Sequence, residues 1–159
     1  MKFIFTLSLF VLLQTLSTAQ VLYKQDFEDG FGDMILIDQD KRPPHPNVGS
    51  LVDAWNLRAA NDDLGISALS TSWTQPVGRA DDWMITPVIS GFGPKTFLLW
   101  NAFALDANFR DGYEVRVSEN GGSEIADFSK VILTVNAENA EVTARSINMS
   151  QFEGKNIRI

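Results

Sequence analysis

The sequence contains no cysteine and a single histidine, His45. A chain without cysteine forms no disulfide bonds and offers neither a thiol nucleophile nor a thiolate metal ligand. Zinc sites are built mainly from cysteine and histidine, so one histidine among carboxylates argues against zinc and favours harder cations. The glycines show no phosphate-binding spacing, and no Gly-x-Ser-x-Gly elbow is present. These absences leave no assembled set of residues for nucleophilic catalysis or nucleotide binding.

Basic residues are also few. Lysine and arginine number 13 against 20 aspartates and glutamates, which gives a formal net charge of −7 at pH 7. Nucleic acids and anionic membranes are bound chiefly through basic patches, so we expect neither as a partner. After residue 19 no apolar run approaches the roughly 20 residues that a membrane helix needs, which argues against membrane insertion. The carboxylates have two interpretations: acidic loops that bind calcium, or a surface that is merely soluble.

The first 19 residues have the three parts of a secretory signal peptide. Lys2 supplies the positive charge, residues 3–13 are almost entirely apolar, and residues 17–19 are small, as at a cleavage site. We therefore expect a protein that is secreted or displayed at the cell surface. The mature chain would start near Gln20 and form one domain, residues 20–159, with a formal charge of about −8 because Lys2 is removed.

Residues 81–89 are the most informative segment of the chain. As a strand, this segment places Trp83, Ile85 and Pro87 on one face, because side chains alternate along a strand. Both faces are then largely apolar, as in a strand that is covered on both sides. Pro87 lacks an N–H and is expected at a sheet edge, at a bulge or at the end of the strand.

The rest of the chain shows short apolar or alternating stretches separated by turn residues, a pattern typical of β-sandwiches. We predict an all-β, antiparallel, jelly-roll-like β-sandwich. Besides residues 81–89, the expected strands are residues 21–28, 34–37, 51–57, 66–73, 96–105, 112–118, 128–136 and 141–148. The residues expected in the core include Phe27, Trp83, Ile85, Leu99, Val115 and Val117.

Four loops are expected where prolines, glycines and polar residues concentrate. Sandwich loops carry recognition on a rigid scaffold, so we expect the contact surface of the domain there. The four loops are residues 38–50, 61–65, 74–80 and 106–112.

Residues 81–87, with the sequence Asp-Asp-Trp-Met-Ile-Thr-Pro, resemble the Asp/Asn-x-Trp-Leu-Ile-Thr-Pro signature of the cleaved adhesin domains, also called choice-of-anchor J domains. Softer similarities are found at Phe27-Glu28-x-Gly30, at Ser72-Trp73, in residues 113–118 and in residues 152–155. The resemblance implies a module of secreted bacterial adhesins or haemagglutinin regions that binds a host or matrix glycan or protein. It also implies bound calcium in related modules. In that family further closing strands follow the segment at Ile159, so the resemblance implies a domain that is truncated at its C-terminus.

Four carboxylates are candidate ligands for a structural calcium ion, namely Asp26, Glu28, Asp81 and Asp82. They lie at the end or the start of expected strands that could neighbour one another, and calcium accepts oxygen ligands from separate loops. An enzymatic alternative uses two of the same residues. On one strand face, Asp26 and Glu28 would have Cα atoms about 6.5 to 7 Å apart, near the spacing of glycosidase carboxylates.

Two of the four tryptophans, Trp55 and Trp73, border polar loops and are candidates for contact with a ligand. Trp83 and Trp100 sit in the most apolar stretches and are expected in the core. The leading function is a non-catalytic adhesion module that binds a carbohydrate or a protein. The alternatives are a jelly-roll glycan hydrolase that uses Asp26 and Glu28, and a purely structural accessory module of a larger secreted protein.

Overall fold

The computed structural model describes residues 19–59 and 65–159. The expected signal peptide, apart from Ala19, and most of the expected loop at residues 61–65 lie outside these ranges. The helices within the described ranges are 3-10 helices of three residues, η1 (Pro46–Val48), η2 (Ile125–Asp127) and η3 (Ser150–Phe152). A search of this part of the chain finds no helix with the length and apolar character needed to cross a membrane.

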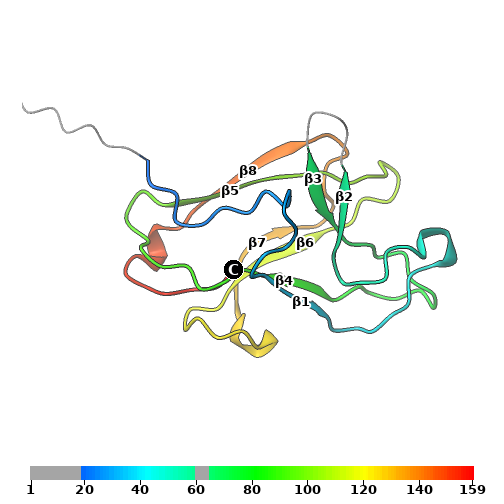
Figure 1. Ribbon diagram of the computed structural model, residues 1–159, viewed down its shortest axis with the longest axis horizontal. Coiled ribbons are helices and arrows are strands. Elements are labelled where there is room, and N and C mark those ends of the chain that lie inside the picture. Colours follow the sequence, from blue (N-terminus) through cyan, green and yellow to red (C-terminus); the bar gives the residue numbers. More distant parts are fainter. Residues whose placement is uncertain (1–18, 60–64) are drawn as a thin grey trace, which may run out of the picture.

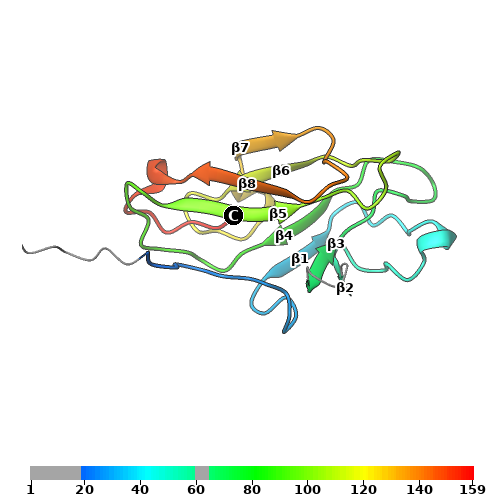
Figure 2. The same cartoon turned by 90° about the horizontal axis from the view of Figure 1, so that it is seen from above.

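Eight strands build the described part of the chain, and all four of their ladders are antiparallel (Figure 1, Figure 2). β1 pairs with β4, β2 with β3, β5 with β8, and β6 with β7. The predicted all-β, antiparallel class is therefore confirmed. The strands are β1 (Ile35–Asp38), β2 (Asn56–Ala59), β3 (Ile66–Leu69), β4 (Asp82–Ile85), β5 (Phe97–Ala102), β6 (Tyr113–Val117), β7 (Lys130–Val135) and β8 (Thr143–Asn148).

The segment at residues 81–89 forms β4 and its extension, as predicted. Ile85 is buried, with 1% of its surface exposed. Trp83 packs against Phe128 with 5.7 Å between the ring centroids. The strand ends at Ile85, so Pro87 lies beyond its last residue, where the missing N–H costs no ladder bond.

Residues 157–159 join the extension of β4 to the end of β6, and we call them the C-terminal clasp. Ile157 exchanges backbone hydrogen bonds of 2.8 and 3.0 Å with Ile89, and Arg158 exchanges bonds of 3.0 and 3.1 Å with Ser118. The guanidinium of Arg158 also donates to the carbonyl oxygen of Thr86 at 2.8 Å. The clasp thus holds the β1–β4 and β6–β7 ladders next to each other (Figure 1).

The hydrophobic core lies under the β5–β8 ladder. Leu98 of β5 and Ile147 of β8 pack onto it, and so does Ile132 of β7. Phe92 and Phe152 meet edge to face in its centre, with 6.5 Å between ring centroids. Fully burying a side chain of this kind contributes roughly 1.5 to 3 kcal/mol. The buried members of the core cluster are Ile89, Phe92, Val117, Met149, Phe152 and Ile157.

A buried polar network links the β5–β8 ladder to β6. Glu138, in the connection between β7 and β8, is 4% exposed and accepts hydrogen bonds of 2.6 and 2.8 Å from the guanidinium of Arg145. Tyr113 donates to the same carboxylate at 2.9 Å, and the indole N–H of Trp100 donates to the Tyr113 hydroxyl oxygen at 3.1 Å. The bonds from Arg145 outweigh the effect of burial and lower the pKa of Glu138 to about 2. We call these four residues the Glu138 network.

The prediction of a strand at residues 21–28 is wrong. None of these residues belongs to a strand, and Phe27 has a φ of 65°, in the left-handed region that interrupts an extended chain. The side-chain oxygen of Gln25 accepts a hydrogen bond from the Phe27 N–H at 2.7 Å. Local bonds of this kind compete with a strand ladder. Phe27 is therefore only half-buried beside Phe31, whereas Leu22 and Tyr23 are the residues that pack on the core.

The prediction that Leu99 belongs to the core is also wrong. β5 turns Leu98 and Trp100 inward, whereas Phe97 and Leu99 are 53% and 70% exposed. Both faces of this stretch are apolar, so alternation alone does not decide which one is buried. Leu99 accordingly does not belong to the core.

A bulge in β7 changes part of the predicted pattern. Val115 pairs with Leu133 and Arg116 pairs with Val131, so Ile132 is an extra residue between the two pairs. One extra residue moves the following side chains to the other face of a strand. Val131 is accordingly 41% exposed, and Ile132 packs on the core.

Two further strands are shorter than predicted, and the loops beside them are confirmed. The strand expected at residues 51–57 begins only at Asn56, and the one expected at residues 66–73 ends at Leu69. Apart from an isolated bridge between Pro44 and Thr74, the loops expected at residues 38–50, 74–80 and 106–112 contain no strand beyond Asp38, the last residue of β1.

Candidate functional site

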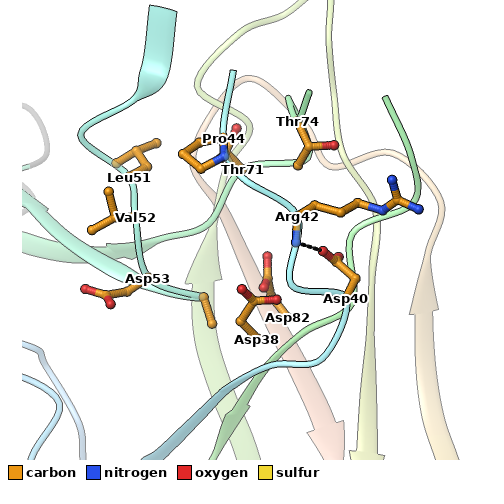
Figure 3. A pocket seen from close by; sticks show the side chains of 11 residues that line it. Asp38, Asp40, Arg42, Pro44, Leu51, Val52, Asp53, Thr71, Thr74 and Asp82 are labelled. Atoms are coloured by element: carbon orange, nitrogen blue, oxygen red, sulfur yellow. Dashed lines mark hydrogen bonds between the residues drawn. The ribbon is translucent and has the colours of Figure 1, made fainter. Parts of the chain in front are cut away.

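Two carboxylates face each other where β1 ends and β4 begins. Asp38 and Asp82 are direct partners in the antiparallel register, and such partners carry their side chains on the same face. Both carboxylates therefore enter one small pocket (Figure 3). Its volume is about 20 Å³, which is enough for one water molecule or one ion. We call it the acidic pocket; its other lining residues are Asp40, Arg42, Pro44, Leu51, Val52, Asp53, Ala54, Thr71 and Thr74.

The ionised form of Asp82 is disfavoured in this pocket. Burial is the main cause of its raised pKa, and the neighbouring charges of Asp40, Asp38 and Asp81 raise the pKa further. A hydrogen bond of 2.7 Å from the Ser70 hydroxyl opposes the shift. Carboxylate oxygens with few donors can hold a cation or accept hydrogen bonds from a ligand. No histidine or cysteine lines the pocket.

Asp40 and Asp81 hold the loops beside the acidic pocket. Asp40 accepts hydrogen bonds from the backbone N–H groups of Arg42 at 2.8 Å and of Asp81 at 2.6 Å. The side chain of Asp81 accepts a bond of 2.7 Å from the indole N–H of Trp83. Asp81 therefore points away from the acidic pocket, although it adjoins Asp82 in the sequence.

Asp26 and Glu28 lie on a different part of the surface. Asp26 pairs with Lys24 at 2.7 Å, and this hydrogen bond lowers the Asp26 pKa. Glu28 accepts a bond of 2.9 Å from the backbone N–H of Ile66. The left-handed Phe27 stands between them, so the strand-face spacing assumed for a hydrolase is not present.

The four predicted calcium ligands do not fit as one metal site. In residues 19–59 and 65–159, no group of three or more aspartate, glutamate, histidine or cysteine side chains is placed to hold a metal ion. Of the predicted four, Asp82 alone lines the acidic pocket, where its partner is Asp38. Any cation held there would need most of its oxygen ligands from the backbone or from water.

Three of the expected loops converge at one end of the molecule, on the right in Figure 1 and in Figure 2. The backbone N–H of His45 donates to the carbonyl oxygen of Trp73 at 2.8 Å. The Ser72 hydroxyl donates to a carboxylate oxygen of Asp111 at 2.6 Å, and this bond connects the third loop, at residues 106–112, to the other two. We call this surface the loop end; it comprises residues 39–50, 70–81 and 103–112.

An aromatic pair stands at the centre of these connections. Trp73 is 48% exposed and stacks on His45, with 4.3 Å between ring centroids and 11° between ring planes. The Nδ1 atom of His45 accepts a hydrogen bond from the backbone N–H of Asn47 at 3.2 Å, which holds the imidazole in place. An exposed indole on a fixed support is well suited to contact a ligand, because it offers a large apolar face and loses little conformational entropy on binding.

Trp55, the other candidate for ligand contact, lies elsewhere. It lines an open groove of about 710 Å³ beside β2, together with Phe31 and Leu57. This volume falls in the range of known ligand pockets. The structure therefore places the two candidate tryptophans at separate concave or exposed surfaces.

A solved structure resembles this fold over most of its length. It is the K3 cleaved adhesin domain of Lys-gingipain (Kgp) from Porphyromonas gingivalis W83, with a TM-score of 0.59 and 21% sequence identity over 86% of this chain and 85% of that chain. The chain has the fold of a cleaved adhesin domain. No protein-family model and no curated protein matches the sequence. At this level of identity the likeness shows the fold, and it confirms at that level the resemblance seen in residues 81–87.

Asp38, Asp40 and His45 were not among the predicted site residues. For Asp38 a signal existed, because it ends one short apolar segment and Asp82 begins another, so an antiparallel pairing with aligned ends brings them together. For His45 the sequence holds no such signal. Its stacking on Trp73 depends on the bridge between Pro44 and Thr74, which joins two separate loops.

Proposed function

We propose that this chain is a non-catalytic adhesion module with a jelly-roll-like sandwich, secreted or displayed at the cell surface, and that its loop end binds a host or matrix glycan or protein. The observation that carries the proposal is the exposed Trp73, stacked on His45 where three loops converge. The fold that it shares with an adhesin domain supports the proposal. The hydrolase alternative is weakened because Asp26 and Glu28 share no strand face and each already binds a neighbouring donor.

Replacing Trp73 with alanine should weaken ligand binding by at least about tenfold, because interface tryptophans commonly contribute 2 kcal/mol or more. The ligand is first selected on a glycan array and a panel of immobilised matrix proteins, and its affinity is then titrated. Phe97→Ala is the matched control, since Phe97 is also about half exposed, at 53%, but lies on the outer face of β5. We expect this control to bind as the unchanged chain does.

Other outcomes of the same experiment separate the alternatives. Full binding by Trp73→Ala would place the contact outside the loop end. The absence of any ligand in both panels would favour the structural accessory module. Release of reducing sugar that disappears in Glu28→Gln would establish the hydrolase instead.

We propose further that calcium stabilises the module through Asp38 and Asp82. The two carboxylates share a pocket of about 20 Å³, and a cation between them would relieve part of the like-charge repulsion that acts on Asp82. Calcium tolerates a mixture of carboxylate, carbonyl and water ligands, and it needs six to eight oxygens in all. The proposed role of the ion is structural, because it would link the end of β1 to the start of β4.

Millimolar calcium should raise the melting temperature relative to excess chelator, because an ion that binds only the folded chain stabilises it by mass action. At 100 times the dissociation constant this amounts to about 2.7 kcal/mol. Asp82→Asn should abolish the response without lowering the stability of the calcium-free chain, since the ionised form of Asp82 is disfavoured. Asp26→Asn, which alters an exposed carboxylate outside the pocket, should keep the response. The proposed site would be eliminated if calcium left the melting temperature unchanged. It would also be eliminated if calcium still raised the melting temperature of the Asp82→Asn variant.

A further inference from the structure

The groove beside β2 runs along an unpaired strand edge. Among the described strands β2 has one partner, β3, and three of its four residues, 56–58, line the groove, as does Trp55 just before the strand. Successive side chains of a strand point to opposite faces, so a surface that touches all three must include the edge between the faces. Among the described residues no backbone hydrogen bond reaches β2 except from β3. Within the described part of the chain, this edge of β2 therefore has backbone N–H and C=O groups with no backbone partner.

The two sides of this edge differ in chemistry. Leu57, which is 43% exposed, and Trp55, just before the strand, present apolar surface next to Phe31. Asn56 and Arg58 alternate with Leu57 along the strand and are polar. A ligand that lies along the edge thus meets apolar surface on one side and the basic Arg58 on the other, and Asp53 of the preceding loop also lines the groove.

We propose that the β2 edge binds an extended peptide segment as an added strand, with apolar side chains toward Trp55 and Leu57 and acidic side chains toward Arg58. In this mode main-chain hydrogen bonds provide affinity, and alternate side chains provide specificity. The inference rests on the proposed function in so far as the chain is a binding module, and it adds a ligand class and a second contact surface. Arg58 is exposed and lines the groove, so the proposal places its guanidinium opposite an acidic side chain of the peptide.

A sugar fits this groove less well than a peptide. Sugar rings bind mainly by stacking on an exposed aromatic face, and Trp55 is more deeply buried than Trp73, with its indole N–H enclosed. Three strand residues in a row line the groove, a feature that a stacked ring would not use, whereas an added strand would use the backbone groups of alternate residues.

The test uses a fluorescein-labelled hexapeptide of alternating valine and glutamate, titrated with the full chain by fluorescence polarisation. Arg58→Glu should weaken this complex by about tenfold or more, because like charges meet across the edge. The same variant should bind the valine and lysine version of the peptide better than the unchanged chain does. Lys95→Glu, an exposed charge reversal in the connection between β4 and β5, is the matched control and should leave both affinities unchanged.

A second measurement tests the edge itself. A valine and glutamate peptide that is N-methylated at every residue should not bind, because neither of its edges keeps an N–H donor, and the unmodified peptide should slow hydrogen exchange of backbone amides in residues 56–59. The inference is overturned if the peptide does not bind. It is also overturned if neither N-methylation of the peptide nor Arg58→Glu in the protein lowers the affinity. Glycan binding that Trp55→Phe removes, without peptide binding, would assign the groove to a sugar. A ligand that is lost in Trp73→Ala while the peptide fails to bind would leave the proposed function standing and remove this inference alone.

Discussion

Replacing Glu138 with glutamine should lower the free energy of unfolding at pH 7 by roughly 2 to 4 kcal/mol, the cost of breaking a buried ion pair. Glutamine keeps the size of the side chain but removes the charge that neutralises Arg145, whose side chain is only 21% exposed. The Tyr113 hydroxyl then donates to a weaker acceptor. The same hydroxyl oxygen accepts the hydrogen bond from the Trp100 indole N–H, so that bond is affected as well. Urea unfolding, followed by tryptophan fluorescence, measures the loss.

The pH dependence of stability should change with the same substitution. Because the pKa of Glu138 is lowered from 4.5 to about 2 in the folded chain, its carboxylate stabilises the fold above about pH 4.5. That contribution, up to about 3 kcal/mol, is lost as the pH falls from 4.5 through 2. The Glu138→Gln variant should lack this part of the acid transition, so its curve and that of the unchanged chain should converge toward pH 2.

Glu119→Gln is the matched control for this prediction. Glu119 accepts from Lys155 at 2.6 Å and lies 3.5 Å from Lys130, but its side chain is 39% exposed. Exposed pairs contribute at most about 1 kcal/mol because water screens them. If Glu138→Gln proved no more destabilising than Glu119→Gln, the Glu138 network would not hold the two ladders together.

Alanine in place of Gly112 should destabilise the domain by about 3 kcal/mol or more, because overpacking against fixed atoms forces the backbone to move. A Cβ atom at this position would lie within 3 Å of the carbonyl oxygens of Val135 and Asn136. Both are backbone atoms at the end of β7, so no flexible side chain can move aside. Gly93→Ala is the control, since nothing lies within 4 Å of its Cβ position. Equal stability of the two variants in urea would show that the β6–β7 ends separate easily.

The features that the sequence predicted well are those that neighbouring residues determine. The segment with Ile85 and Pro87 is apolar on both faces and contains a residue without an N–H, so both its burial and the end of β4 follow locally. The loops follow in the same way from proline and glycine. The inward face of β5 does not, because Leu98 and Leu99 are equally apolar and only the packing of the whole domain selects Leu98.

The candidate sites depend on pairings between distant segments, and the sequence predicted one residue of each site but not its partner. Asp82 was found because it sits in a recognisable motif, but its partner Asp38 comes from the register of β1 with β4. Trp73 was found as an exposed aromatic candidate, and its support by His45 comes from a contact between loops. The residues of the Glu138 network come from three different strands and from the loop between β7 and β8, so no periodic pattern in the sequence predicts it.

The prediction of a strand at residues 21–28 failed for a different physical reason. Alternation in residues 21–28 is real, but the side chain of Gln25 satisfies the Phe27 N–H locally and removes it from any ladder. The candidate pair Asp26 and Glu28 depended on that strand. Its loss removes their shared face and, with it, the geometric basis for an acid and base pair.

The C-terminal clasp bears on the order in which parts of the domain fold. Its Ile159 N–H donates to the Thr86 hydroxyl oxygen at 3.0 Å across 73 positions of the sequence, and Ile157 is fully enclosed in the core. Contacts between such distant positions form late and slowly, because a long loop must close first. The core therefore closes only when residues 157–159 have joined it.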